Sequence, residues 1–400
     1  MKIAMMTNNY KPFVAGVPIS IERLADSLRL KGHRVVVFAP SYAGQKEEED
    51  VVRYRSLLRN VAGGFSVPDC LDPAIEREFF RGDFDLIHVH HPMMAGNAAR
   101  YLSRKYQVPL VFTYHTRYEQ YLHYVGLSSF KSVMPAYIRS FARDCDGVIA
   151  PTPLMKEYLD GIGVKSSVRV LPTGLTGESF LPDEKNAAGI RRKYAQDGRD
   201  LFCCVARLAK EKNLDFLMRS MRLYKERGGR AFRLLLIGDG PCRKELEVLA
   251  ARQGLAQEIA FVGSVPNREI ADYCYACELF LFASQSETQG IVLSEAMAAK
   301  TPVLAVRATG TQDVVVNGVN GYMTQDSEAE FAAKLMDILE KKELELLTRG
   351  ALGTARQYEA GEIAHRAEKI YGEAVKIREE KIRAQYYHRK KRKNMLYSQG

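Results

Sequence analysis

Short runs of apolar residues alternate along the chain with longer stretches whose apolar positions recur at helical spacing. In the first half, the apolar runs predict five buried strands: KIAMM (2–6), RVVVFAP (34–40), DLIHVH (85–90), PLVFTY (109–114) and GVIAP (147–151). Helix-like stretches at 18–31, 94–106 and 133–143 lie between them. Nearly continuous apolar strands separated by helices are typical of parallel sheets covered on both faces.

The same rhythm restarts after a stretch rich in Gly, Pro and Asp. The second set of predicted strands is LFCCVAR (201–207), FRLLLIGDG (232–240), IAFVG (259–263), LFLFAS (279–284) and PVLAV (302–306). From about residue 327 onward the pattern is helical. Two such runs predict two doubly wound α/β domains. We therefore predict an N-terminal domain over 1–172, a linker over 173–199, a second domain over 200–365, and a C-terminal helix with a basic tail over 366–400.

Composition agrees with a two-domain globular protein. The chain has 400 residues, of which 46% are hydrophobic and 26% charged, and this length is enough for more than one buried core. No apolar run approaches the length of a transmembrane helix, and the start MKIAMMTNNY does not resemble a signal peptide.

Seven cysteines at irregular spacing indicate free thiols, and the CxxC pair Cys274 and Cys277 lacks the second pair of a zinc site. We predict a cytoplasmic protein.

The net charge of +10 is concentrated at the C-terminal end. Between Lys376 and the last residue, nine Lys or Arg face two Glu, a net charge of +7, which leaves +3 for the rest of the chain. The densest part is the basic cluster, defined as Arg389, Lys390, Lys391, Arg392 and Lys393. A solvated helix end, a contact with an anionic membrane, and nucleic-acid binding all fit such a cluster. Nucleic-acid binding is disfavoured because the charge is confined to one end and no recognition motif accompanies it.

Polar segments follow most of the predicted strands. In doubly wound sheets, ligands bind outside the carboxyl ends of the strands, so these segments are expected to face one interdomain cleft. In ARLAKEKN, Arg207 and Lys212 follow a strand and precede a helix predicted to begin near Asn213. Two cations at a helix N-terminus form a suitable site for a diphosphate. Two solvated surface charges are the alternative.

The segment SETQGIVLSEA places two carboxylates, Glu287 and Glu295, eight residues apart. On one helix this spacing corresponds to about 12 Å along the axis, too far for one shared metal ion. If the helix begins near Gly290, Glu287 lies on the preceding loop, and the backbone N–H groups of Gly290 and Ile291 point towards an anion. The two acids then suit the two polyol ends of a nucleotide-sugar.

Glycines and histidines complete the candidate site. Gly16 and Gly238 follow strands, and each is explained either by a close approach of a ligand or by a plain turn. Neither belongs to a complete GxGxxG or Walker motif, so no NAD or ATP site is expected. His88 and His90 share one face of a strand, but no further metal ligands accompany them. His115 follows a strand and is expected to enter the cleft.

Aromatic residues follow His115 at helical spacing, among them Tyr118 and Tyr121. A core stripe is one interpretation of this spacing. An aromatic wall for an apolar acceptor is the other.

Taken in order along residues 1–375, these motifs resemble the retaining glycosyltransferases of family 4, which have the GT-B fold. The resemblance is carried by the first strand with Gly16, DLIHVHHP, His115, LPTGLTGESF, ARLAKEKN, GDGP and the two glutamates of SETQGIVLSEA. It implies two Rossmann-like domains facing a cleft, and a site that needs no metal or other cofactor. It also implies residue roles: Arg207 and Lys212 for the diphosphate, Glu287 for the hydroxyls of the transferred sugar, Glu295 for the ribose, and His115 for the sugar near the reacting carbon.

Within that family, YHTRYEQYLHY and SETQGIVLSEA resemble the bacterial diacylglycerol glucosyltransferases most closely. One departure is Val17, where many members carry a second glycine after Gly16. The resemblance implies a peripheral enzyme on the inner face of the cell membrane that transfers a sugar, glucose from UDP-glucose, to diacylglycerol with retention. A soluble acceptor is the alternative. The basic cluster then contacts anionic lipid, and Tyr386 and Tyr387 lie at the level of the headgroups.

Overall fold

The chain is described by a computed structural model that covers residues 1–13, 15–45, 48–61, 65–117, 132–285, 287–341 and 343–397. The side chains of residues 59–61, 65 and 388–397 lie outside this description. The chain divides into two compact units. Unit 1 contains Met1–Gly174 and the segment that begins at Gly361, and unit 2 contains Leu175–Ala360.

Unit 1 is built around a seven-stranded parallel sheet in the order β3-β2-β1-β6-β7-β8-β9. Its strands are β1 (Lys2–Met6), β2 (Arg34–Pro40), β3 (Val51–Tyr54), β6 (Leu86–Val89), β7 (Leu110–Thr113), β8 (Gly147–Ala150) and β9 (Val168–Val170). The connecting helices are α1 (Gly16–Leu30), α2 (Pro73–Gly82), α3 (Ala95–Tyr106), α5 (Met134–Asp144) and α6 (Pro153–Gly161). An antiparallel hairpin of β4 (Ser56–Val61) and β5 (Phe65–Pro68) adds to the unit. The strand order reverses between β1 and β6, so the connections after these two strands diverge there.

Unit 2 is built around a six-stranded parallel sheet in the order β12-β11-β10-β13-β14-β15. Its strands are β10 (Asp200–Val205), β11 (Phe232–Ile237), β12 (Ile259–Gly263), β13 (Leu279–Phe282), β14 (Val303–Val306) and β15 (Gly321–Thr324). The α-helices are α7 (Glu184–Tyr194), α8 (Leu214–Glu226), α9 (Arg243–Arg252), α10 (Ile270–Tyr275), α11 (Ile291–Ala298), α12 (Thr309–Gln312), α13 (Glu328–Glu340) and α14 (Leu344–Arg356). Short 3₁₀ turns are η3 (Gly177–Phe180), η4 (Lys210–Lys212) and η5 (Asn267–Glu269). Here the order reverses between β10 and β13.

Both sheets are buried on both faces, as the continuous apolar runs predict. In β1, Ala4 and Met6 belong to one buried cluster, whereas Ile3 and Met5 belong to the cluster on the other face. Alternate residues of a strand point to opposite sides, so a strand with a core on each side has no polar face. All ten strands predicted from the sequence are present, and the predicted fold class is confirmed.

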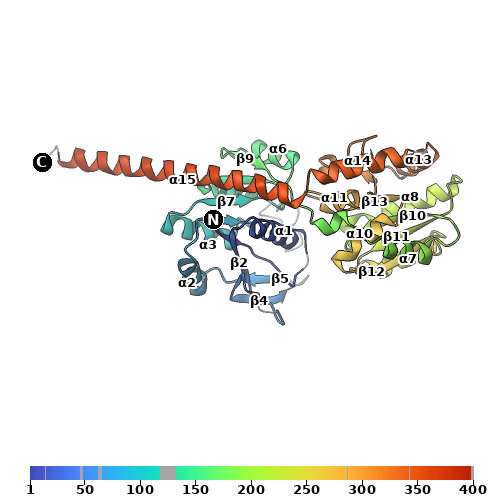
Figure 1. Cartoon of the computed structure of the whole chain (residues 1–400), viewed down its shortest axis with the longest axis horizontal. Coiled ribbons are helices and arrows are strands. Elements are labelled where there is room, and N and C mark those ends of the chain that lie inside the picture. Colours follow the sequence, from blue (N-terminus) through green and yellow to red (C-terminus); the bar gives the residue numbers. More distant parts are fainter. Residues whose placement is uncertain are drawn as a thin grey trace. The chain divides into compact units, whose positions relative to one another are not determined.

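The long helix α15 (Ala360–Tyr397) corrects the predicted domain limits. Its buried positions recur at helical spacing: Ile363, Ala364, Ala367, Ile370, Tyr371 and Ala374. They share a buried cluster with residues of β1 and β2, so this part of the helix covers one face of the unit 1 sheet (Figure 1). The predicted boundary at 365 is displaced, because unit 2 ends at Ala360. The helix predicted over 366–400 is present as part of α15, and its apolar face completes the core of unit 1 from Gly361 onward.

A buried carboxylate of unit 1, that of Asp146, forms ion pairs with the middle of α15. The side chain of Asp146 is fully buried, and it pairs with Arg378 at 2.7 Å and with Lys381 at 2.8 Å. Asp146 also accepts a hydrogen bond from the backbone N–H of Leu110 at 2.9 Å. A charge removed from water needs such partners. Two of the basic residues that the sequence analysis assigned to the tail are therefore structural.

The predicted linker is also corrected. Residues 173–199 contain η3 and α7, and Ala187 and Ile190 of α7 are buried in a core of unit 2. Their apolar side chains pack beside α10, so the segment is folded into unit 2 from Leu175 onward. None of the helices in the described part of the chain has the length and apolar composition needed to cross a membrane.

Candidate functional site

In unit 2, the candidate residues follow the two strands at which the sheet order reverses. Lys212 lies in η4, after β10, and Glu287 lies after β13. The two strands are neighbours, so connections that are distant in the sequence meet at the carboxyl edge of the sheet. Ligands of doubly wound sheets bind at this position.

Lys212 and Glu287 form an ion pair at this edge, with about one fifth of each side chain exposed, 21% and 19%. Ser284 Oγ lies 3.2 Å from Glu287 Oε1 and 3.2 Å from the backbone carbonyl oxygen of Glu211. The predicted helix start near Asn213 is confirmed, since α8 begins at Leu214. Both side chains are thus held in place while remaining open to solvent. An ammonium group has three N–H donors, so Lys212 can bond to Glu287 and to an anion together.

Arg207 is the more exposed of the two predicted diphosphate ligands. Its guanidinium group pairs with Glu211, and 61% of its side chain is accessible to solvent. Arg207 and Lys212 are therefore both near the end of β10, each with a carboxylate partner. Their role in holding a diphosphate stays a prediction.

The backbone of Glu287 packs against a glycine that the sequence analysis did not single out. A β-carbon at Gly310 would lie 2.6 Å from Cβ of Glu287 and 2.9 Å from its carbonyl oxygen. Gly310 belongs to α12, which follows the next strand of the sheet, β14. The close contact fixes the position of Glu287. A glycine four positions after the predicted strand 302–306, in RATGTQD, was the available signal.

The helix predicted to follow Glu287 is confirmed. Gly290 adopts a left-handed conformation, with φ of 67°, and α11 begins at Ile291. This φ is favourable for glycine, and a β-carbon there would lie only 3.0 Å from the carbonyl oxygen of Gly310. Glu287 therefore precedes the helix, and Glu295, which is partly buried, lies in its second turn. In the first turn of α11, the N–H of Leu293 donates to the carbonyl of Gly290 at 2.9 Å. The N–H groups of Ile291 and Val292 precede it and are the candidate donors to an anion.

Gly238 is required by a close contact between two connections. Its φ is 131°, and a β-carbon would lie 2.1 Å from the carbonyl oxygen of Ala206. The turn after β11 thus packs directly on the turn after β10. This contact explains the glycine without a ligand, and the predicted part of Gly238 in donor binding stays a prediction.

In unit 1, the loop after β1 is bonded to the loop after β6. The imidazole Nδ1 of His91 lies 3.2 Å from the backbone nitrogen of Asn8, and Asn8 Oδ1 accepts from the N–H of Ala95 at 3.0 Å. Gly16 begins α1, and no described atom lies within 4 Å of the place where its β-carbon would be. Packing among the described residues therefore does not require glycine at this position.

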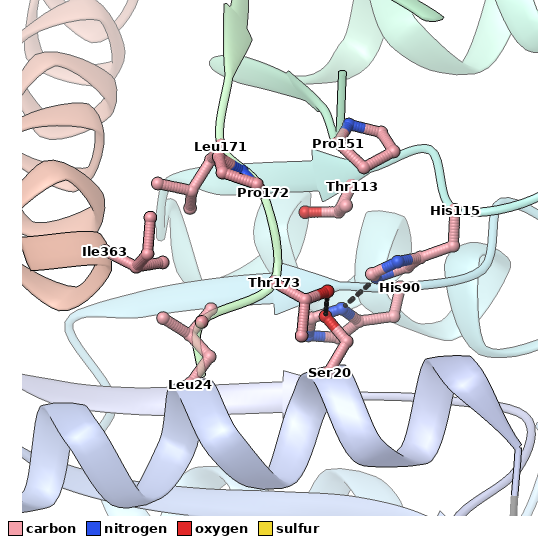
Figure 2. Close-up of a pocket in the computed structure, with 11 residues that line it drawn as sticks. Ser20, Leu24, His90, Thr113, His115, Pro151, Leu171, Pro172, Thr173 and Ile363 are labelled. Atoms are coloured by element: carbon pink, nitrogen blue, oxygen red, sulfur yellow. Dashed lines mark hydrogen bonds between the residues drawn. The ribbon is translucent and has the colours of Figure 1, made fainter. Parts of the chain in front are cut away.

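Two of the histidines in unit 1, His90 and His115, line a small pocket beyond the ends of β6 and β7 (Figure 2). His90 Nδ1 lies 2.9 Å from His115 Nε2, and the two rings stack with their centroids 5.2 Å apart. His88, one pleat earlier in β6, bonds to Thr113 and Tyr371. The pocket is lined by Ser20, Leu24, His90, Thr113, His115, Pro151, Leu171, Pro172, Thr173, Gly174 and Ile363.

The histidine cluster, defined as His88, His90, His91 and His115, is neutral at physiological pH. Burial lowers the pKa of His88 to about 3 and that of His91 to about 4. Burial, with a smaller contribution from the neighbouring imidazoles, lowers the pKa of His115 to about 3 and that of His90 well below its usual value. His115 therefore carries no positive charge, and because its Nε2 is bonded to His90, it presents only its Nδ1 to a ligand.

Some predicted site residues cannot be placed. Tyr118 and Tyr121 lie outside the described residues, and Arg389–Lys393 lie in α15 with side chains outside the description. Cys274 and Cys277 are buried free thiols. Among the residues that the structure describes, no three His, Cys, Asp or Glu side chains form a group that could hold a metal ion.

Comparison with known proteins assigns each half of the chain to a family model. Residues 14–176 match the model described as Glycosyltransferase Family 4, and residues 188–349 match the model described as Glycosyl transferases group 1. An alpha-monoglucosyldiacylglycerol synthase of Streptococcus pneumoniae is 31% identical over 321 residues, which cover 76% of this chain and 71% of that protein. The alpha-monoglucosyldiacylglycerol synthase of Acholeplasma laidlawii is 27% identical over 400 residues, 96% of this chain and 99% of that protein.

Another relative is named for its donor, GDP-mannose. A GDP-mannose-dependent alpha-mannosyltransferase of Mycobacterium tuberculosis is 27% identical over 336 residues, 82% of this chain and 85% of that protein. Among solved structures, HepE of Anabaena in complex with UDP has a TM-score of 0.74 at 19% identity, over 92% of this chain and 99% of that one. The sucrose-phosphate synthase of Thermosynechococcus elongatus has a TM-score of 0.76 at 18% identity, over 92% and 98%. At these identities the structures support the fold alone.

Proposed function

The chain belongs to glycosyltransferase family 4, and from this premise we propose that it transfers glucose from UDP-glucose to diacylglycerol with retention of the anomeric configuration. It is a glycosyltransferase with the GT-B fold that the sequence predicted. The observation that carries the finer proposal is the similarity to two alpha-monoglucosyldiacylglycerol synthases, one of them matched over nearly the full length of both chains. The cleft expected between the two domains stays a prediction.

On the donor side, we assign the diphosphate to Lys212, Arg207 and the N-terminus of α11. The Lys212 ammonium, which pairs with Glu287, also donates to a phosphate oxygen. Negative charge grows on the diphosphate as the bond to the sugar breaks, so cations held near it stabilise the transition state more than the ground state. Glu287 then accepts from sugar hydroxyls, and Glu295 accepts from the ribose diol.

The proposed reaction takes place on one face of the sugar. The bond between the anomeric carbon and the diphosphate oxygen breaks, and the bond to the acceptor oxygen forms on the same face. The acceptor hydroxyl gives its proton to the leaving diphosphate. No metal takes part in this proposal, because Arg207 and Lys212 supply the positive charge. His115 is assigned to the sugar near the reacting carbon, as the resemblance implies.

For the acceptor and the membrane, the support comes from α15 and from the relatives' names. Tyr386 and Tyr387 are exposed on α15, 66% and 75%, directly before the basic cluster Arg389–Lys393. Aromatic side chains next to cations suit the headgroup region of an anionic membrane. We place the enzyme on the inner face of the cell membrane, with Tyr118 and Tyr121 towards the apolar acceptor.

A second donor remains a specific candidate, because the mannosyltransferase of Mycobacterium tuberculosis uses GDP-mannose by its name. One experiment separates the candidates. The purified chain is incubated with UDP-glucose, UDP-galactose or GDP-mannose and with vesicles that contain diacylglycerol, or with soluble sugars, and the lipid and aqueous products are analysed. Glucosyl-diacylglycerol with an α-linkage by proton NMR is expected.

The other results of this experiment have defined meanings. Product only with GDP-mannose would replace the donor, and product only in the aqueous phase would replace the acceptor. A β-linked product would contradict the retaining mechanism. A nucleic-acid-binding role, the remaining alternative for the basic cluster, predicts a salt-dependent RNA mobility shift, and we expect none at physiological salt.

A further inference from the structure

A series of buried polar atoms starts on α15 and leads to His115. The hydroxyl of Tyr371, which is fully buried, lies 2.8 Å from His88 Nδ1, its one hydrogen-bond partner among the described residues. A buried O–H without an acceptor costs free energy. Tyr371 therefore donates to Nδ1, and neutral His88 carries its proton on Nε2.

Thr113 receives the next hydrogen bond. His88 Nε2 lies 2.7 Å from Thr113 Oγ1, so the imidazole N–H donates and the hydroxyl accepts. Thr113 is 4% exposed, and its hydroxyl has no second partner within the described ranges. Because Thr113 lines the pocket, its hydroxyl proton is free to point into that space.

The pocket holds a matching acceptor. His90 is 1% exposed, and its Nε2 forms no hydrogen bond with any described residue. His90 lines the same pocket as Thr113 (Figure 2). The space open to the centre of a water-sized molecule is about 20 Å³, and a buried water needs roughly 10–15 Å³ of such space and at least two polar partners. The pocket therefore has room for one water molecule between the two groups.

We propose that this pocket binds one ordered water, which accepts from the Thr113 hydroxyl and donates to His90 Nε2, so that the series from Tyr371 fixes the proton of His115 on Nδ1. The last step follows from the geometry. With Nε2 as an acceptor, neutral His90 carries its proton on Nδ1 and donates it to His115 Nε2 over 2.9 Å. Neutral His115 then has its proton on Nδ1.

The proposal gives every hydrogen bond in the series one direction. Reversal would require His88 Nδ1 to donate to Tyr371, which would leave the buried hydroxyl proton without an acceptor. Each imidazole is neutral, as the lowered pKa values of the cluster require. Tyr371, Thr113 and His90 are thus positioning residues. One further step rests on the proposed function: the Nδ1–H of His115 donates to an oxygen of the sugar.

The test is nitrogen-15 NMR of the full-length chain with labelled histidine, because protonated and unprotonated ring nitrogens have well separated shifts. For the parent, we expect His90 and His115 with Nδ1 protonated and Nε2 unprotonated. In Thr113→Val, which keeps the shape and removes the hydroxyl, and in Tyr371→Phe, we expect mixed tautomers at His115. Tyr54→Phe is the matched control, since Tyr54 is also buried in unit 1 and donates to the carbonyl of Thr7 at 2.8 Å.

The outcomes separate this inference from the proposed function. Nε2-protonated His115 in the parent, or unchanged tautomers in both folded variants, would overturn the inference whatever the enzyme's activity. Correct tautomers without glucosyl transfer would contradict the proposed function and leave the inference standing. In an active enzyme, we expect kcat/KM to fall about tenfold in Thr113→Val, the equivalent of one hydrogen bond, and to stay at the parent value in Tyr54→Phe.

Discussion

Lys212 and Glu287 form an ion pair although 75 positions separate them in the sequence. The pair joins the connections that follow two neighbouring strands, β10 and β13, at the point where the order of the sheet reverses. Neither side chain is free to move independently, so the cation and the acid proposed to hold opposite parts of the donor are positioned together.

Replacement of Lys212 by Ala should lower kcat/KM by about 100- to 1,000-fold, the usual effect of removing one group that stabilises transition-state charge. Steady-state kinetics with UDP-glucose and circular dichroism check the effect and the fold. Arg222→Ala is a matched control. Arg222 lies in α8, the helix that follows Lys212, and forms an exposed ion pair with Glu226. If Lys212→Ala retained the parent's kcat/KM, the diphosphate assignment would be wrong.

Replacement of Gly310 by Ala should impair catalysis through Glu287. The added methyl group would approach Cβ of Glu287 to 2.6 Å, so the backbone of Glu287 must move. We expect kcat/KM to fall at least tenfold, because displacements of about 1 Å at a catalytic group can cost about 100-fold. In the control, Gly353→Ala, no described atom lies within 4 Å of the new methyl group, and its position inside α14 should make that variant slightly more stable.

Replacement of residues 389–393 by Gln should weaken binding to phosphatidylglycerol vesicles without a change in thermal stability. Five cations at about 1 kcal/mol each give an upper limit of about 5 kcal/mol at low salt, and salt should reduce the difference. Co-sedimentation over a salt series measures it. Equal pelleting of the Gln variant and the parent at every salt concentration would remove the basic cluster as the membrane contact.

A truncation after Val375 should behave differently, because it also removes Arg378 and Lys381. Asp146, whose side chain is fully buried, would then lose both partners. An unpaired buried carboxylate costs about 3–5 kcal/mol, so the melting temperature of the truncated chain should fall well below that of the Gln variant. Calorimetry of the two proteins side by side tests the structural role of α15.

The buried histidines should make stability depend on pH. The folded-state pKa values of His88 and His91, about 3 and about 4, lie below that of a histidine in an unfolded chain, about 6.5. The stability they contribute is therefore complete above pH 6.5 and is lost as the pH falls, by about 1.4 kcal/mol per pH unit for each histidine. Urea unfolding between pH 7 and pH 5 measures how the free energy of unfolding changes with pH. In His88→Asn, this change should be smaller by the contribution of one histidine, about 1.4 kcal/mol per pH unit.

Activity should survive a chelator, because the proposed reaction relies on Arg207 and Lys212 for positive charge. Glucosyl transfer is measured in about 5–10 mM EDTA, which is a large excess over any trace metal. It is then compared with transfer after dialysis into a buffer that contains Mg²⁺. Equal rates are expected. A loss of activity that Mg²⁺ or Mn²⁺ restores would show that a metal ion participates.

The sequence was sufficient to predict strands that are buried on both faces, because those strands consist of nearly continuous apolar residues. It did not predict β3, β9 and β15, whose segments VVRY, VRV and GYMT mix apolar and polar residues. All three lie at sheet edges, where only part of a strand is buried and the apolar signal is weak.

The local geometry of the site was also predictable, and its long-range contacts were not. The starts of α8 and α11, at Leu214 and Ile291, follow from glycine and polar residues placed just before them. The contact of Gly310 with Glu287, and that of Tyr371 with His88, join residues on different elements. Periodicity in one segment carries no information about such partners.

The return of the chain to unit 1 at Gly361 has a consequence for the order of folding during synthesis. Unit 2 is one continuous segment, Leu175–Ala360, so all of it can leave the ribosome and fold while unit 1 is still incomplete. Domains generally fold as units during synthesis, N-terminal ones first, but here unit 1 must wait for the segment that begins at Gly361. Until α15 arrives, Asp146 lacks its cationic partners and an apolar face of the first sheet is uncovered. The nascent chain therefore exposes this apolar surface until α15 is synthesised and covers it.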